Sequence, residues 1–123
     1  MWQAHVDTLL DTKGMDQAAI IGSDGATWAK SNGFSISPAE SETLGRLFVN
    51  PADATSNGVT VGGNKYSVRE ADDSFIMGRK GPGGMLAVKT RTAVVVAVYG
   101  EGQYVNARKA TEQVAEYMME NNY

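Results

Sequence analysis

The chain has 123 residues, 42% of them hydrophobic, which suits one domain with an ordinary core and leaves little room for a second. It has no cysteine, which excludes disulfides and thiol chemistry, and its 20% charged residues without low-complexity runs argue against disorder. No apolar run is long enough to span a membrane and no signal-peptide pattern opens the chain, so we expect a cytoplasmic protein whose single domain covers residues 1–123.

The net charge of −3 is unevenly distributed along the chain. Residues 1–64 contain three basic and seven acidic residues, whereas residues 65–109 contain eight basic and four acidic ones. Residues 110–123 contain three acidic residues and no basic one. The positive middle block predicts either a face for an anionic partner or simply a soluble sheet surface, and charge alone slightly favours the second.

The beginning of the chain predicts a helix followed by a β-hairpin. Apolar residues recur at helical spacing in the first ten residues, and Gly14 ends the pattern. Two strands are then predicted over residues 17–21 and 26–30, joined by a turn at residues 22–25. The apolar positions of the helix are Trp2, Val6, Leu9 and Leu10.

A second helix is predicted over residues 38–48. Ser37 can cap it, Pro38 suits the first turn, and Glu40 supplies the acid of a capping box. Its apolar stripe consists of Leu44, Leu47 and Phe48.

From residue 58 the pattern changes to short strands and tight turns, followed by a last helix from about Asn106. Glycine-rich or acidic turns separate the strands, and Gly62-Gly63-Asn64 is suitable for a hairpin. The last strand is almost wholly apolar and β-branched, as expected for a central strand covered on both faces. This order of elements predicts one α+β domain with an antiparallel sheet flanked by helices. The predicted strands are residues 59–61, 65–70, 74–79, 85–90 and 93–99.

Residues suited to catalysis or metal binding are scarce. His5 is the only histidine, so neither a Ser-His-Asp site nor a Cys/His zinc site is expected. The glycine-rich residues 78–84 lack the Gly-Lys-Ser/Thr of a phosphate loop, and they join two predicted strands. Glu70, Asp72 and Asp73 bracket a turn without an EF-hand pattern. We therefore predict no enzymatic activity, no cofactor, no metal and no nucleic-acid partner.

Aromatic side chains mark both ends of the chain. Trp2 opens the first helix, Trp28 lies in the second strand, and Tyr117 and Tyr123 lie in or beyond the last helix. Taken singly, core packing explains Trp2 and anchoring on a sheet face explains Trp28. Large aromatics at chain ends are nevertheless unusual, because termini tend to fray. If the terminal helices lie side by side, the four rings form a row that suits a polyproline II ligand, whose carbonyls accept hydrogen bonds from hydroxyl and indole groups.

Five motifs resemble the profilin family, in order and at family-like spacing, and the resemblance covers the whole chain. The compact length and the turn at residues 79–84 are most similar to amoebal, protist and plant profilins. The resemblance implies an antiparallel sheet with the N- and C-terminal helices on one face and the remaining helix on the other. The motifs are residues 2–7, 19–22 with 27–29, 62–66, 78–84 and the final helix ending in tyrosine.

The resemblance also implies a site for proline-rich proteins such as formins. His5 stands where the family often has tyrosine, and imidazole can still stack and donate a hydrogen bond. The implied polyproline-binding residues are Trp2, His5, Trp28, Tyr117 and Tyr123.

Monomeric actin is the second partner that the resemblance implies, and phosphatidylinositol bisphosphate is the third. Most of the implied actin residues fall in the positive block, and a basic patch would steer acidic actin. We expect the protein itself to be a monomer. The implied actin-binding residues are Lys65, Ser67, Arg69, Arg79, Lys80, Arg108, Lys109 and Gln113. The implied phosphoinositide-binding residues are Arg79, Lys80, Lys89 and Arg91, of which the last two share strand parity.

Two alternatives from other classes remain at this point. A small-molecule sensor of the PAS or GAF type would need an enclosed apolar cavity, which tight β-branched packing at residues 93–98 opposes. A longin- or roadblock-like scaffold would dimerise through its sheet.

Overall fold

Strand β7 (Ala93–Tyr99) lies at the centre of the fold. Its apolar residues are buried toward both faces of the sheet, because helices cover each face. The computed structural model describes residues 2–123. The other elements are α1 (Trp2–Leu10), β1 (Met15–Gly22), β2 (Thr27–Lys30), α2 (Pro38–Val49), α3 (Pro51–Asn57), β3 (Val59–Val61), β4 (Asn64–Ala71), β5 (Phe75–Lys80), β6 (Gly83–Lys89) and α4 (Tyr104–Glu120).

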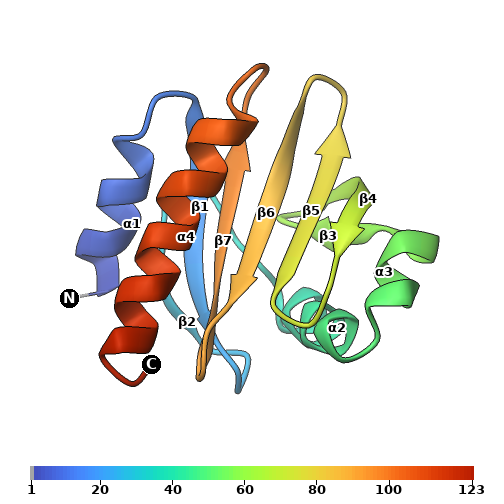
Figure 1. Ribbon diagram of the computed structural model, residues 1–123, viewed down its shortest axis with the longest axis horizontal. Helices are drawn as coiled ribbons and strands as arrows, with labels where there is room; N and C mark the ends of the chain where they lie inside the picture. The colour runs from blue at the N-terminus through green and yellow to red at the C-terminus, as the bar shows by residue number, and fades with distance from the viewer. Residues whose placement is uncertain (1) are drawn as a thin grey trace.

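The strands of the described residues form one antiparallel sheet in the order β2-β1-β7-β6-β5-β4-β3 (Figure 1). β1 pairs with β7 through register partners such as Ile20 and Val95, although the two strands are far apart in the sequence. From β3 to β7 each strand pairs with the next one along the chain, as tight turns dictate. The pairing of β1 with β7 therefore joins the two halves of the chain.

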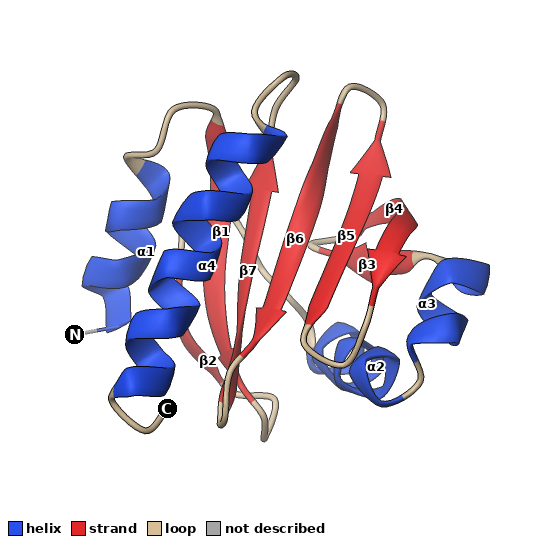
Figure 2. Ribbon diagram, viewed as in Figure 1, coloured by secondary structure: helices blue, strands red, loops and turns tan. Residues whose placement is uncertain are grey.

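Two layers of helices enclose this sheet (Figure 2). α1 and α4 lie side by side on one face and form a core with side chains of β1, β6 and β7. α2 and α3 bury apolar side chains in a separate core on the opposite face. The predicted α+β architecture, with terminal helices on one face, is confirmed. No helix within residues 2–123 is long and apolar enough to cross a bilayer.

Most strand and helix ends differ from the prediction by one or two residues, and three elements show why. α3 was not expected, because only Ala54 of its seven residues is buried and no apolar stripe marks it. α4 begins at Tyr104, two residues before the expected start. β6 begins at Gly83 within the predicted turn, where a Cβ atom would lie 2.5 Å from the carbonyl oxygen of Tyr99. Glycine there permits close packing against β7, and the sequence pattern alone suggests only a turn.

Glu40 joins α2 to the hairpin between β3 and β4. The predicted capping box is present, with Ser37 and Glu40 each accepting a hydrogen bond of 3.1 Å from the other's backbone amide. The same carboxylate accepts hydrogen bonds of 3.0 Å from the amides of Gly62 and Gly63. Both glycines have positive φ, +60° and +79°, as a tight hairpin turn requires. One side chain thus fixes the start of α2 against the turn.

Replacement of Glu40 by alanine should lower the free energy of unfolding by about 1–3 kcal/mol, because three backbone amides lose a charged acceptor. Glu42→Ala is the matched control: it removes only the exposed ion pair with Arg46 and should cost about 0.2–0.5 kcal/mol. Chemical denaturation measures both values. Equal losses in the two variants would contradict the role given to Glu40.

Candidate functional site

Small side chains bring the two terminal helices close to the sheet and to each other. Ala18 and Ala97 on the sheet and Ala107 and Ala115 on α4 are fully buried in the shared core. α1 is also tied to β2, since the side-chain amide of Gln3 donates a 3.0 Å hydrogen bond to the backbone oxygen of Lys30. The ends of α1 and α4 consequently meet above β1 and β2.

Five aromatic rings converge where these ends meet. Trp2 lies at the centre, with ring centroids 4.9 Å from Trp28, 4.7 Å from Tyr123 and 6.1 Å from His5. His5 in turn lies 5.1 Å from Tyr117. These separations are those of favourable tilted and edge-to-face aromatic pairs. The structure brings together all five residues of the predicted polyproline site, and we call them the aromatic cluster.

Gly22 determines how Trp28 lies in the cluster. A Cβ atom at Gly22 would lie 2.5 Å from the indole nitrogen of Trp28, so the indole occupies the space that a side chain would take. Any larger residue at this position would displace the ring.

Tyr123 is held by its backbone. α4 ends in a Schellman motif, in which Asn122 has a φ of +69° and the amide of Tyr123 donates to the backbone oxygen of Met118 at 2.8 Å. The backbone oxygen of Tyr123 accepts hydrogen bonds from the amide of Thr92 at 2.6 Å and from the hydroxyl of Thr90 at 2.7 Å. Chain ends usually fray, but these bonds fix Tyr123 against the turn between β6 and β7.

The aromatic cluster is open to solvent and has free polar groups. Tyr117 and Tyr123 are 52% and 38% exposed, and a hollow of about 320 Å³ is lined by four of the five rings, all but Trp28, and by Asn121. Within residues 2–123, no hydrogen bond engages the hydroxyls of Tyr117 and Tyr123 or the indole groups of Trp2 and Trp28. These donors are available to the carbonyl groups of a bound ligand.

A second polar surface lies beside α4 on the same side of the sheet. In β4, Tyr66 and Val68 point into the core beneath α2 and α3, so Lys65 and Ser67 point to the α4 side. Arg79 is the register partner of Ser67 and shares its face. Arg69 sits at a bulge in β4, next to these residues. Lys109 and Gln113 are exposed on α4.

Arg108 connects α4 to this surface. Its guanidinium lies 4.2 Å from the ring centroid of Phe75 and donates a 2.7 Å hydrogen bond to the hydroxyl of Tyr104. That hydrogen bond, helped by the nearby Glu112 and Glu70, raises the pKa of Arg108 above its ordinary value. The ion pairs with the two carboxylates are half exposed, so they orient the side chain more than they stabilise the fold.

Comparison with known proteins identifies the family. The family model described as Profilin matches residues 1–123. The chain belongs to the profilin family. It is 42% identical to profilin-2 of Acanthamoeba castellanii over 120 residues, which cover 96% of this chain and 95% of that protein. It is 37% identical to profilin-1 of Dictyostelium discoideum over 124 residues, covering 99% and 98% of the two chains.

Solved profilin structures agree with this assignment. The crystal structure of Acanthamoeba castellanii profilin II matches with a TM-score of 0.95 at 39% identity, covering all of both chains. Mouse profilin IIa, solved in complex with a double repeat from the FH1 domain of mDia1, matches with a TM-score of 0.80 at 25% identity, covering 99% of each chain. The resemblance to the profilin family seen in the sequence is confirmed. The two alternatives, a PAS- or GAF-type sensor and a longin- or roadblock-like scaffold, lose their support.

Some predicted site residues of this profilin do not come together. Lys80 has the opposite strand parity to Arg79, and its ammonium group donates to the side-chain oxygen of Asn64. Lys89 and Arg91 lie at the other end of β6 from Arg79 and Lys80, about 20 Å away at 3.3 Å per residue. Arg91 also lies in the turn after β6, so the expected strand parity with Lys89 does not apply. The four predicted phosphoinositide residues therefore form two separate pairs. In residues 2–123, no group of three or more His, Cys, Asp or Glu side chains is placed to bind a metal.

Asn122→Ala should release Tyr123 from the aromatic cluster, because alanine lacks the short polar side chain that eases the left-handed conformation for asparagine and so pays the full cost of about 1–2 kcal/mol there. The NMR signals of the Tyr123 ring should then lose the ring-current shifts caused by Trp2 and Trp28. Asn122→Gly is the matched control and should keep those shifts. Unchanged Tyr123 signals in Asn122→Ala would show that Asn122 does not position the ring.

Proposed function

We propose that this protein binds proline-rich segments and monomeric actin, and thereby regulates actin polymerisation in the cytoplasm. The observation that carries the proposal is the convergence of five aromatic rings at the two ends of the chain. The mouse relative solved with an FH1 repeat supports a proline-rich ligand of the formin type. The proposal includes no covalent step, so the protein acts by binding alone.

The aromatic cluster suits a polyproline II segment for a physical reason. Proline rings pack on flat aromatic faces, and the solvated carbonyls of such a segment need donors. Trp2 and Trp28 offer indole groups, and Tyr117 and Tyr123 offer hydroxyls, none of them engaged within the described residues. Because a polyproline II segment is extended before it binds, little ordering entropy opposes binding.

The polar surface beside α4 is the proposed actin site. Lys65, Arg69 and Arg79 lie around Ser67 on β4 and β5, and they belong to the positive block of the sequence. Exposed positive charges would steer an acidic partner and raise its association rate. The network around Arg108 supplies a fixed anchor at the edge of this surface. Lys109 and Gln113 extend the proposed site along α4. Lys80 points to the opposite face of β5, so it would reach actin only from the edge of this surface.

The two proposed sites use different parts of α4, so both partners should bind together. Lys109 and Tyr117 are two turns apart on the helix, about 12 Å at 1.5 Å per residue. Sites that share no contacts usually behave independently. The protein would then hold an actin monomer and a proline-rich assembly factor at the same time.

We further propose that phosphoinositide headgroups contact Arg79 and Lys80, the basic pair nearest the actin surface. The two side chains point to opposite faces of β5, but both are exposed at the end of the strand beside the turn to β6, where a headgroup bound at this end of the sheet would reach each of them. A headgroup there would compete with actin for Arg79. Lys89 and Arg91 form the other pair at the far end of β6, and we assign them no part in this contact.

Trp2→Ala should weaken the binding of a polyproline peptide by about 1–3 kcal/mol, because it removes the ring that contacts three others. Titration followed by the fluorescence of Trp28 measures the affinity. Actin affinity should stay the same, which controls for folding. An unchanged polyproline affinity in a folded variant would refute the aromatic site.

Arg79→Glu should slow actin association at low salt, because it reverses a charge on the proposed steering surface. Lys89→Glu carries the same charge change at the other end of β6 and should leave the rate nearly unchanged. Stopped-flow mixing at several salt concentrations measures both rates. Arg79→Glu should also abolish competition between phosphoinositide vesicles and actin while keeping polyproline binding. If actin associates with both variants at equal rates, β5 does not belong to the actin site.

A further inference from the structure

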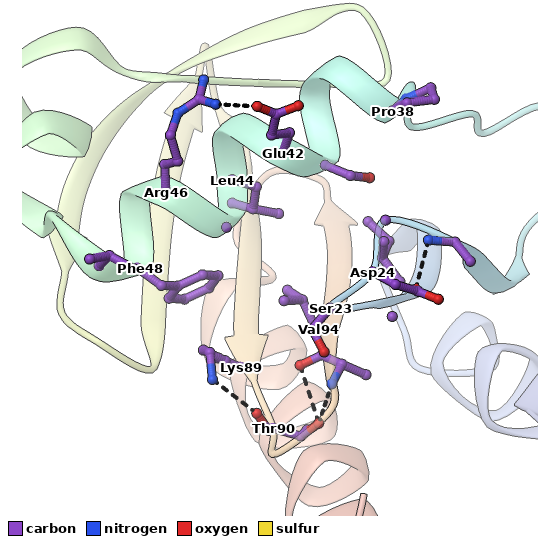
Figure 3. A pocket seen from close by; sticks show the side chains of 18 residues that line it. Ser23, Asp24, Pro38, Glu42, Leu44, Arg46, Phe48, Lys89, Thr90 and Val94 are labelled. Atoms are coloured by element: carbon purple, nitrogen blue, oxygen red, sulfur yellow. Dashed lines mark hydrogen bonds and ion pairs between the residues drawn. The ribbon is translucent and has the colours of Figure 1, made fainter.

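A groove on the opposite face of the sheet from the aromatic cluster belongs to neither proposed site. It lies between α2, the turn that joins β1 to β2, and the adjoining ends of β6 and β7 (Figure 3). Its volume of about 740 Å³ is within the range of small-molecule sites.

The floor of this groove is apolar. Leu44 and Phe48 of α2 line it together with Ile21 of β1 and Val94 of β7. Gly45 of α2 also lines the groove, and no atom lies within 4 Å of the position that its Cβ atom would take, so a side chain there would enter open space. At the rim Val49 is 78% exposed, so it adds apolar surface next to the groove.

Lys89 gives the groove a positive charge at its β6 end. Its ammonium group makes one weak hydrogen bond, 3.4 Å to the backbone oxygen of the next residue, Thr90. Among residues 2–123, no carboxylate lies within the 4.0 Å of an ion pair with it. By contrast, Arg46 at the opposite rim is paired with Glu42 at 2.7 Å.

Two further polar groups border the groove. Asp24 follows β1, two strands away from Lys89, and its carboxylate accepts a 3.0 Å hydrogen bond from the amide of Ala26. The hydroxyl of Ser41 is buried in the wall formed by α2 and has no hydrogen-bond partner within the described residues.

We propose that this groove binds a small apolar carboxylate of medium chain length. The carboxylate contacts Lys89, and the apolar body crosses Val94 toward Ile21, under the open side of α2. The distance from β6 to β1 is two strand spacings, about 10 Å, which a medium-chain acyl group spans. Apolar surface supplies the affinity, and Lys89 selects the anion.

Titration of the ¹⁵N-labelled protein with octanoate tests this site, with octanamide as the uncharged analogue. Octanoate should produce saturable shifts of the amide signals of Gly22, Gly45 and Val94. Octanamide should bind about tenfold more weakly, because it lacks the charge that pairs with Lys89.

Two variants test the position of the ligand. Lys89→Gln should reduce octanoate affinity about tenfold and leave octanamide binding unchanged, whereas Arg91→Gln, next to the groove, should change neither. Gly45→Leu should block both ligands, because its side chain enters the open space beside α2. Leucine also favours helix over glycine, so this variant should unfold at the same or a higher temperature.

The outcomes decide the proposal independently of the actin and polyproline assays. Saturable octanoate binding that is lost in Gly45→Leu and weakened in Lys89→Gln supports it. Equal binding of octanoate and octanamide, shifts that do not saturate, or binding that survives Gly45→Leu would each overturn it.

Discussion

The pairing of β1 with β7 is the contact on which the functional surfaces depend. β1 follows α1 and β7 precedes α4, each through a loop of only a few residues, so neighbouring strands force the two helices to lie next to each other. The two loops are themselves joined, since the amide of Gly100 donates a 3.0 Å hydrogen bond to the backbone oxygen of Gly14. The aromatic cluster exists only because residues from both ends of the chain meet there.

α4 serves two surfaces because it is exposed on more than one side. Its buried residues Thr111, Val114 and Met118 hold it on the sheet, while Tyr117 faces α1 and Arg108 faces β5. A helix has only one orientation that buries its apolar stripe, so that stripe also fixes the directions of the two polar sides. Changes in the packing of α4 would therefore disturb both surfaces together, whereas changes on either exposed side remain local.

The sequence predicted features that depend on local pattern and missed those that depend on tertiary contacts. The capping box at Ser37 and Glu40 and the buried strand β7 follow from residue type and spacing, and both are present. The Schellman motif at Asn122 could have been suspected from asparagine near a helix end, but the position of Tyr123 depends on the distant turn at Thr90 and Thr92. Likewise the groove depends on where α2 crosses the ends of the strands. The spacing of apolar residues in the sequence does not predict that crossing.

The groove and the aromatic cluster share parts of their walls. Thr90 borders the groove, and its hydroxyl donates to the backbone oxygen of Tyr123 on the other side of the sheet. Gly22 also borders the groove, and the indole of Trp28 lies against it from the opposite side. The turn between β6 and β7 is further fixed by Ser23, whose backbone amide and hydroxyl donate to the backbone oxygen of Thr92 at 2.8 and 2.9 Å. These bonds make the turns at this end of the sheet one connected unit, so the positions of the rings and the shape of the groove are set by the same backbone.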